Sequence, residues 1–297
     1  MSLLVVGTVA FDTIETPSGK ASKILGGAAT YTCISSSYFT PPNIVSIVGY
    51  DFPNSHIEKF KEHNVNLLGL ETHETEKTFF WEGKYREDMN MRDTIDTQLN
   101  VLEHFNPKIP KDLLNSNYIM LGNVIPSVQL NVLSQLKNNN SLVAMDTMNL
   151  WIDNAYDDLI SVISKVDILM INDQEIQQLQ NVNDIQEAVK KTFSLGPSYI
   201  IVKLGSKGSI LFSKEDKFIC PAVTINDVID PTGAGDSFAG GFMGYLSSIQ
   251  NHSFENMKKA LCWGTVMASF CVQGFGTETI LNLEKDAYLK RFNENFS

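Results

Sequence analysis

Positive charge is scarce in this sequence. Its 297 residues include 23 lysines and arginines against 34 aspartates and glutamates, so the formal net charge is −11 at pH 7. A surface that binds nucleic acid needs clustered basic side chains to neutralise phosphates, and no basic run occurs. We therefore expect no nucleic-acid partner, and an acidic small substrate would need a local positive pocket.

Cysteine and histidine are few and dispersed. The four cysteines form no C-x-x-C pair, and the five histidines form no pair with metal-ligand spacing. We therefore expect neither a zinc site nor a histidine-based catalytic triad, and we expect reduced thiols. The positions are Cys33, Cys220, Cys262, Cys271, His56, His63, His73, His104 and His252.

Long apolar runs are missing as well. None approaches the roughly 18 residues that a membrane span requires. The first residues, MSLLVVGTVAFD, show neither the basic region nor the cleavage site of a signal peptide. The sequence therefore predicts a protein of the cytoplasm with no membrane partner.

Short apolar runs are what the sequence does have, and amphipathic segments separate them. Runs of four to seven residues are typical of buried parallel strands, and the intervening segments have the 3-and-4 spacing of covering helices. This alternation predicts one α/β domain over 1–297, with a doubly wound, mostly parallel sheet and helices on both faces. The runs are LLVVG, NIVSIVG, YIMLG, LVAMD, DILMIN and YIIVKLG.

Two segments, residues 13–25 and 72–101, break this alternation. In the second, KTFFWEGKYRED alternates aromatic and polar side chains around Gly83, which predicts a small antiparallel element with one covered and one exposed face. We interpret both segments as a β lid. Trp81 and Tyr85 can stack on a ligand or pack within the lid, and we expect Arg86 and Arg92 to be solvated.

Residues 227–246, DVIDPTGAGDSFAGGFMGYL, concentrate glycine before an apolar helix. The pattern matches neither a P-loop nor a dinucleotide fingerprint, which disfavours a nicotinamide enzyme. Gly233 and Gly235 let successive N–H groups converge around Ala234, which builds an anion hole at a helix N-terminus. Asp236 in the first turn can accept the proton of an attacking alcohol. The alternative is an ordinary turn in which Asp236 caps the helix.

Five motifs in order resemble the ribokinase-like (PfkB) family of carbohydrate and nucleoside kinases. DPTGAGDSFAGGF is similar to the family's C-terminal signature, and VVGTVAFD, LGGAATY, NDQE and VKLGSKG are similar to its other elements. The resemblance spans nearly the whole chain. It implies an ATP-dependent phosphotransferase whose acceptor is an alcohol group of a small sugar or polyol, with Asp236 as base and residues 233–236 as the anion hole.

The resemblance also implies substrate and nucleotide residues. Asp12 matches the carboxylate that holds sugar hydroxyls, and we expect it at the carboxyl end of the first strand, where α/β sheets bind ligands. The other implied substrate residues are Gly26, Gly27 and Tyr31. The implied nucleotide-binding residues are Asn172, Lys203, Gly205 and Gly208.

The resemblance also implies residues that bind metal ions. Glu175 would serve Mg²⁺ through a bound water, because magnesium dehydrates reluctantly. As an alternative, Glu175 is only a favourable acid in the first turn of a helix. Asp230 and Thr232 match positions that hold a monovalent cation, K⁺, in some members. The resemblance further implies a homodimer through the lid, although edge strands can also be shielded within one chain.

The sequence departs from the family pattern at three places. Tyr31 stands where ribokinases, fructokinases and adenosine kinases usually carry an asparagine, and Lys203 replaces a more usual threonine. The motif D-x-N-x-R fails after Asp146, where Met148 and Leu150 follow. The alternatives are a nucleoside kinase of the adenosine type and a silent ligand-binding protein, which would not need a base beside an anion hole.

Overall fold

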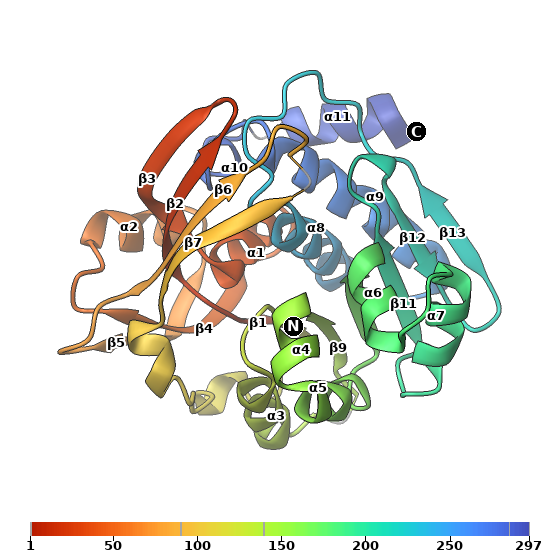
Figure 1. The fold of residues 1–297 in the computed structure, drawn as a ribbon. Helices are drawn as coiled ribbons and strands as arrows, with labels where there is room; N and C mark the ends of the chain where they lie inside the picture. Colours follow the sequence, from red (N-terminus) through yellow and green to blue (C-terminus); the bar gives the residue numbers. More distant parts are fainter. Residues whose placement is uncertain (1, 90, 139, 285, 297) are drawn as a thin grey trace.

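The computed structural model describes residues 2–89, 91–138, 140–284 and 286–296 (Figure 1). Its strands form two sheets. The central sheet has nine strands in the order β13-β12-β11-β10-β9-β8-β1-β4-β5, and the second has four in the order β3-β2-β6-β7. None of the described helices combines the length and apolar character that crossing a bilayer requires.

The six predicted runs all form parallel strands of the central sheet. They are β1 (Leu3–Val6), β4 (Pro42–Gly49), β8 (Tyr118–Leu121), β9 (Leu142–Asp146), β10 (Ile168–Asn172) and β11 (Tyr199–Lys203). Beyond β11, the antiparallel strands β12 (Ser209–Phe212) and β13 (Lys217–Cys220) complete this end of the sheet. Parallel β5 (Asn66–His73) lies outside the predicted set, because half of this edge strand is exposed and polar.

Helices cover both faces of the central sheet, as predicted. Leu3 and Val5 of β1 face one core, whereas Leu4 and Val6 face the other. The first core is covered by α1 (Ala28–Ser37), α2 (Asn54–Glu62), α8 (Ala234–Ile249), α9 (Phe254–Cys271), α10 (Glu278–Leu281) and α11 (Ala287–Phe296). The second is covered by α3 (Pro126–Gln135), α4 (Asn149–Asn154), α5 (Tyr156–Ile163), α6 (Asp173–Gln180) and α7 (Ile185–Phe193).

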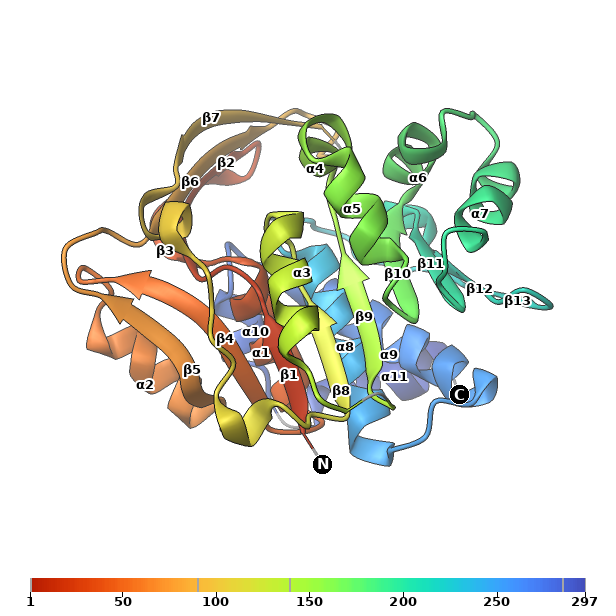
Figure 2. The ribbon, with the colours of Figure 1, turned by 90° about the horizontal axis from the view of Figure 1, so that it is seen from below.

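The four-stranded sheet, called the lid sheet below, is built from the two segments that break the alternation. It contains β2 (Ala10–Thr16), β3 (Gly19–Gly26), β6 (Phe79–Tyr85) and β7 (Arg92–Gln98). Figure 2 shows it above the end of the central sheet toward which β9 points. The sheet is mixed rather than wholly antiparallel, because β2 and β6 run parallel. Gly83 lies inside β6 at a register shift.

Candidate active site

The N-terminus of α8 is the centre of the site. Gly233 is the residue before the helix, with φ 73°, and no side chain caps the helix. A Cβ on Gly233 would lie 2.4 Å from the Tyr31 ring, so both the backbone angle and the space require glycine. The first N–H groups of α8 have no acceptor within the helix. The Ala234 N–H donates to the Pro231 carbonyl at 3.2 Å. The anion hole predicted at Gly233, Ala234 and Gly235 would use this end of the helix.

Glycines further along α8 let it lie very close to its neighbours. A Cβ on Gly240 would stand 2.5 Å from the Thr32 carbonyl oxygen of α1, and one on Gly241 would stand 2.7 Å from the Trp263 carbonyl oxygen of α9. Such distances are too short for any side chain. The glycines after the turn are therefore explained by packing, which fixes the helix end in the core.

Asp236 lies in the first turn of α8 beside this end. It does not cap the helix, since Gly233 takes that position without a side-chain bond. Burial, followed by the repulsion of Asp146, raises the pKa of Asp236 to about 7, although Lys203 opposes this rise. A carboxyl group with that pKa suits a general base near neutral pH.

Asp12 is 4% exposed and lies within β2, not at the end of the first strand as predicted, because β1 ends at Val6. A Cβ on Gly26 would stand 1.9 Å from Oδ2 of Asp12, so glycine leaves room for this carboxylate. Gly27 has φ 93° and precedes α1. Burial, then the charges of Asp230 and Asp236, raise the pKa of Asp12 to about 7.

Tyr31 is only 1% exposed and packs beneath the glycine turn. Its hydroxyl has no hydrogen-bond partner within the part of the chain that the structure describes. Burial, followed by the nearby charge of Asp12, raises the pKa of Tyr31 well above its usual range. The hydroxyl therefore stays protonated and is a donor close to Asp12.

Lys203 ends β11 and reaches the start of α8. Its Nζ donates to both carboxylate oxygens of Asp146, at 2.8 and 2.7 Å. The side chains are 19% and 7% exposed. A Cβ on Gly235 would lie 3.2 Å from this Nζ, so the ammonium stands beside the first turn of α8. Burial disfavours the charge of Lys203, but Asp146 and Glu175 outweigh it and raise the pKa of Lys203.

Asn172 and Glu175 hold each other at the start of α6. The Glu175 N–H donates to the Asn172 side chain at 2.8 Å, and the Asn172 N–H donates to the Glu175 carboxylate at 3.0 Å. This capping box supports the structural alternative for Glu175. Nevertheless, burial raises the pKa of Glu175 to about 7, with Lys203 lowering it and Asp146 raising it. The side chain therefore also faces the charged cluster.

Asp230 ties the glycine turn to the loop before α10. Its carboxylate accepts from the Thr232 N–H at 2.8 Å and from the Gly276 N–H at 2.9 Å. The Thr232 hydroxyl donates to Tyr85 of the lid sheet at 3.1 Å. Burial raises the pKa of Asp230, which these backbone bonds oppose. The Gly276 contact joins the loop of residues 272–278, VQGFGTE, to the site. No motif in the sequence identified this loop as part of the site.

The two lid arginines are both exposed, as predicted, but they differ in what they face. Arg86 pairs with Asp93 at 2.8 Å on the exposed surface. The Arg92 guanidinium lies 5.3 Å from the Trp81 ring centre. Burial opposes its charge, but a hydrogen bond with Tyr85 and the charge of Asp236 raise the pKa of Arg92. Arg92 keeps solvent contact yet faces the site.

The turn after β11 holds the remaining predicted nucleotide residues. Gly205 and Gly208 have φ 57° and 95°, and a Cβ on Gly208 would stand 2.1 Å from the Cys220 carbonyl oxygen. The Leu204 N–H donates to the Gly208 carbonyl at 2.8 Å, which closes the turn. These glycines are required by the hairpin, which brings Lys203 to the edge of the site.

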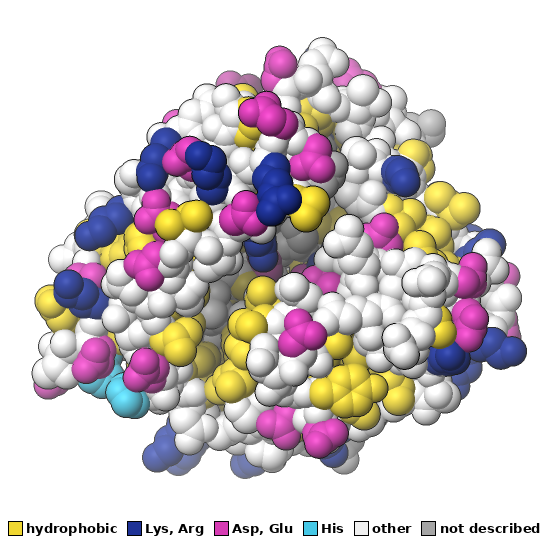
Figure 3. Space-filling model, in the orientation of Figure 1, with side chains coloured by type: hydrophobic (Ala, Val, Ile, Leu, Met, Phe, Trp, Pro, Cys, Tyr) yellow, Lys and Arg dark blue, Asp and Glu magenta, His cyan; other side chains and the backbone are white. Residues whose placement is uncertain are grey.

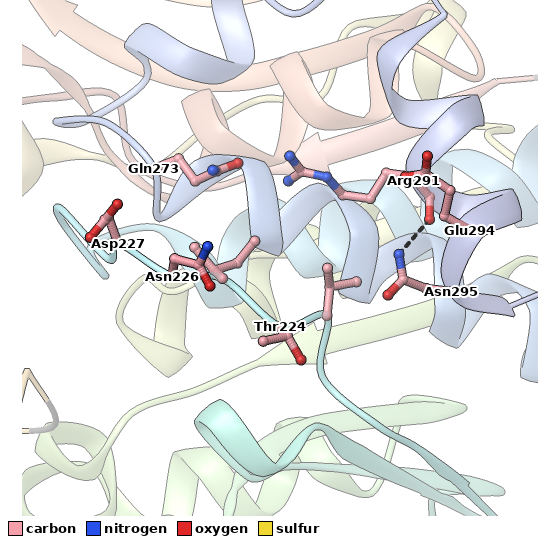
Figure 4. A pocket seen from close by; sticks show the side chains of 9 residues that line it. Thr224, Asn226, Asp227, Gln273, Arg291, Glu294 and Asn295 are labelled. Carbon is pink, nitrogen blue, oxygen red and sulfur yellow. Dashed lines mark hydrogen bonds between the residues drawn. The ribbon is translucent and has the colours of Figure 1, made fainter.

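The surface is hollowed where the lid sheet faces the central sheet, and acidic and basic side chains meet inside this hollow (Figure 3). A separate cavity of about 320 Å³ lies between residues 223–227 and α11. In Figure 4 the Arg291 guanidinium points toward Gln273, and Glu294 and Asn295 lie on the same wall. The Ile229 and Asp230 N–H groups donate to the Val272 carbonyl, so this cavity adjoins the glycine turn.

A doubly wound sheet with a lid, a glycine-built helix N-terminus and a carboxylate in its first turn define the class of small-molecule phosphotransferases. The sequence matches the pfkB family of carbohydrate kinases over residues 2–284. The chain therefore belongs to this family, as the resemblance implied.

Individual relatives agree with this family. A nucleoside kinase of Methanocaldococcus jannaschii is 28% identical over 90% of this chain and 85% of its own. A cytidine kinase of Thermococcus kodakarensis is 26% identical over 82% and 87% of the two chains.

Solved structures share the fold across its full length. The crystal structure of the nucleoside kinase from M. jannaschii has a TM-score of 0.79 at 25% identity, covering 99% of both chains. Arabidopsis thaliana ribokinase complexed with ribose and ATP has a TM-score of 0.77 at 23% identity, covering 100% of this chain and 99% of that one. The predicted fold class is confirmed.

Proposed function

We propose that this protein transfers the γ-phosphoryl group of ATP to an alcohol group of a small sugar or polyol. The observation that carries the proposal is Asp236, a carboxylate with a pKa near neutrality, in the first turn of a helix that begins at the glycine turn and has no side-chain cap. Asp236 takes the proton of the acceptor hydroxyl, and the N–H groups of residues 233–236 hold the oxygens of the phosphoryl group in transfer.

The acceptor lies between Asp12 and the lid sheet. Asp12 receives hydroxyl hydrogen bonds, and Gly26 and Gly27 leave room for the ligand. The unpartnered hydroxyl of Tyr31 supplies a further donor on the same side. Closure of the lid over the acceptor excludes water, which would otherwise compete for the phosphoryl group.

The charge of the site fits a magnesium ion that arrives with ATP. Burial and the repulsion of Asp146 raise the pKa of both Glu175 and Asp236, so a cation there would relieve an excess of negative charge. No group of three ligating side chains gathers among the described residues, so the protein offers no cage of its own. Glu175 would hold Mg²⁺ through a water, and Mg²⁺ supplies neutralisation of the phosphates.

The nucleotide extends from the glycine turn toward the C-terminal helices. Asn172, Lys203, Gly205 and Gly208 flank the phosphates and ribose. The cavity beside residues 223–227 adjoins the turn and carries amide side chains suited to a purine base (Figure 4). A monovalent cation, K⁺, is proposed at Asp230 and Thr232, because burial raises the pKa of Asp230 and a cation would offset this cost.

A second candidate function is a nucleoside kinase. It is favoured by one observation: two relatives that align over four-fifths or more of both chains bear the names nucleoside kinase and cytidine kinase. In that case the acceptor hydroxyl belongs to a ribose, and Asp12 holds the ribose while Trp81 or Tyr85 of the lid sheet contacts the base.

The lid sheet also supports a homodimer. Met91 and Ile95, in and beside the edge strand β7, are 51% and 59% exposed. An unpaired edge with apolar side chains is suited to a second copy. We expect gel filtration with light scattering to give the mass of a dimer for the wild type and that of a monomer for Ile95→Lys, whereas a monomeric wild type would contradict this proposal.

The four free, buried thiols support a cytoplasmic location.

The acceptor is tested with a panel of pentoses, hexoses, inositols and nucleosides in an assay of ADP formation with MgATP. We expect turnover on one class of acceptor. Turnover on a sugar or polyol would favour the first candidate function, and turnover on a nucleoside would favour the second. Replacing K⁺ by choline should lower this rate if the cation site is used. Bound ATP without turnover on any class would contradict a sugar, polyol or nucleoside acceptor.

A further inference from the structure

Lys203 has one donor more than its protein partner uses. A lysine ammonium carries three N–H donors. Two of them point to Asp146, with distances of 2.8 and 2.7 Å to its two oxygens. The third has no acceptor among the contacts of the described residues. The same Nζ would be 3.2 Å from a Cβ on Gly235, which places it over the first turn of α8.

The surroundings of this pair are strongly negative. Glu175 and Asp236 both act on the charge of Lys203, as does Asp146 itself. A site that already holds these carboxylates repels the phosphates of ATP unless cations are supplied. Lys203 is the cation that lies against the glycine turn, whereas Arg92 approaches from the lid sheet.

A purely structural role explains the pair poorly. Buried ion pairs add little net stability, because desolvation offsets the attraction between the charges. Asp146 is 7% exposed at its side chain and Lys203 is 19% exposed, so the pair is not fully closed to solvent. Because its ammonium lies beside Gly235, Lys203 is within reach of an anion at the helix end.

We propose that Lys203 is a catalytic residue that donates its third hydrogen bond to an oxygen of the γ-phosphoryl group, and that Asp146 is a positioning residue that aims the ammonium. This inference rests on the proposed function and adds a contact that discriminates ATP from ADP. The contact strengthens as negative charge moves to the bridging and terminal oxygens during transfer.

The test measures binding of ATP and of ADP separately, by calorimetry with Mg²⁺ and without acceptor. Lys203→Met should weaken ATP binding about tenfold or more, because a charge-assisted hydrogen bond is lost, and leave ADP binding within about threefold. Lys207→Met is the matched control, since Lys207 is exposed in the neighbouring turn. Equal weakening of ATP and ADP, or no change in either, would overturn the role of Lys203.

Asp146→Asn tests the positioning role, because it should change ATP binding and turnover in opposite directions. The ammonium loses its counter-charge but keeps an oxygen acceptor, so ATP should bind more tightly, by about threefold or more, while turnover falls about tenfold or more. A merely structural aspartate would not improve ATP binding. Unchanged turnover, or weaker binding of both nucleotides, would overturn the role of Asp146.

To distinguish misfolding from loss of the contact between Lys203 and ATP, both Lys203 and Asp146 are replaced in one variant. Lys203→Met with Asp146→Leu leaves no unpaired buried charge, so thermal stability should return to that of the wild type. ATP discrimination should remain lost. A double variant that regains the ATP preference would overturn the inference, whereas a wild type that binds neither nucleotide would refute the proposed function instead.

Discussion

The start of α8 and the lid sheet contribute to one site, but they are held by different forces. The helix is fixed by backbone contacts that only glycine permits, such as Gly240 against Thr32. The lid sheet combines the largely buried strand β2 with the exposed strand β7, and its surface carries ion pairs such as Lys20 with Glu82 at 2.9 Å. Surface pairs contribute little to stability, so the exposed part of the lid sheet is held less firmly than the helix end.

This difference matches the two tasks of a small-molecule kinase. Electrostatic stabilisation of a phosphoryl group needs donors that do not reorganise, and a packed helix end provides them. Admission of the acceptor needs a segment that opens, and the exposed strand β7 of the lid sheet is suited to that. We therefore assign phosphoryl transfer to the packed helix end and selection of the acceptor to the lid sheet.

The largest expected effect concerns the core side of the comparison. Asp236→Asn removes the base and should lower acceptor-dependent turnover by a factor of roughly 10² to 10⁴, with ATP binding retained. Steady-state kinetics and calorimetry measure the two quantities. The control is Asp216→Asn, because Asp216 is exposed in the β12–β13 turn. Turnover of Asp236→Asn equal to that of the control would remove Asp236 as the base.

A smaller effect is expected from the lid sheet. Arg92→Ala should lower kcat/KM by about tenfold or more, because its guanidinium supplies positive charge beside Asp236. Arg86→Ala, six residues earlier in the lid segment, breaks only an exposed pair with Asp93 and should stay within about twofold of the wild type. Equal losses in the two variants would mean that the lid acts through general stability.

Packing of α8 is tested by stability rather than by rate. Gly240→Ala places a Cβ 2.5 Å from the Thr32 carbonyl oxygen and should lower the free energy of unfolding by about 1–3 kcal/mol. Ser248→Ala on the exposed side of the same helix should change it little. Denaturant titrations compare them, and a neutral Gly240→Ala would show that the helix end is not held by this contact.

The smallest effect is the pH dependence of stability without nucleotide. Burial raises the pKa of Asp12 and Asp236 to about 7, so the folded state binds their protons more tightly than the unfolded chain does. Their contribution is complete below about pH 4, declines as the pH rises and is lost above about pH 7. The melting temperature of Asp236→Asn should therefore fall less steeply with rising pH than that of the wild type. Parallel profiles would contradict the assignment.

Much of this arrangement could be predicted from the sequence. Continuous apolar runs predicted six strands, since a buried parallel strand leaves a local signal, and the glycine turn predicted the helix end beside Asp236. Edge strand β5 gave no such signal because its exposed side is polar. The location of Asp12 in β2 was missed because the chain leaves the central sheet after Val6.

Other parts depended on long-range contacts that no local pattern records. Asp146 was notable only for an incomplete motif, and its partner Lys203 lies 57 residues away. Arg92 is exposed, as expected of a polar residue in this strand, but no local pattern predicted that its guanidinium would lie over Trp81 and interact with the charge of Asp236. Gly276 joins Asp230 across 46 residues. Such contacts follow from topology.

The central claim is that the γ-phosphoryl group passes to an alcohol at the N-terminus of α8. It is tested most directly by phosphorus NMR of the wild type with MgATP and the acceptor found in the panel. The account predicts that the γ-phosphate signal is replaced by that of a phosphate monoester on the acceptor, in step with ADP. Formation of inorganic phosphate alone, at a rate that the acceptor does not change, would contradict it.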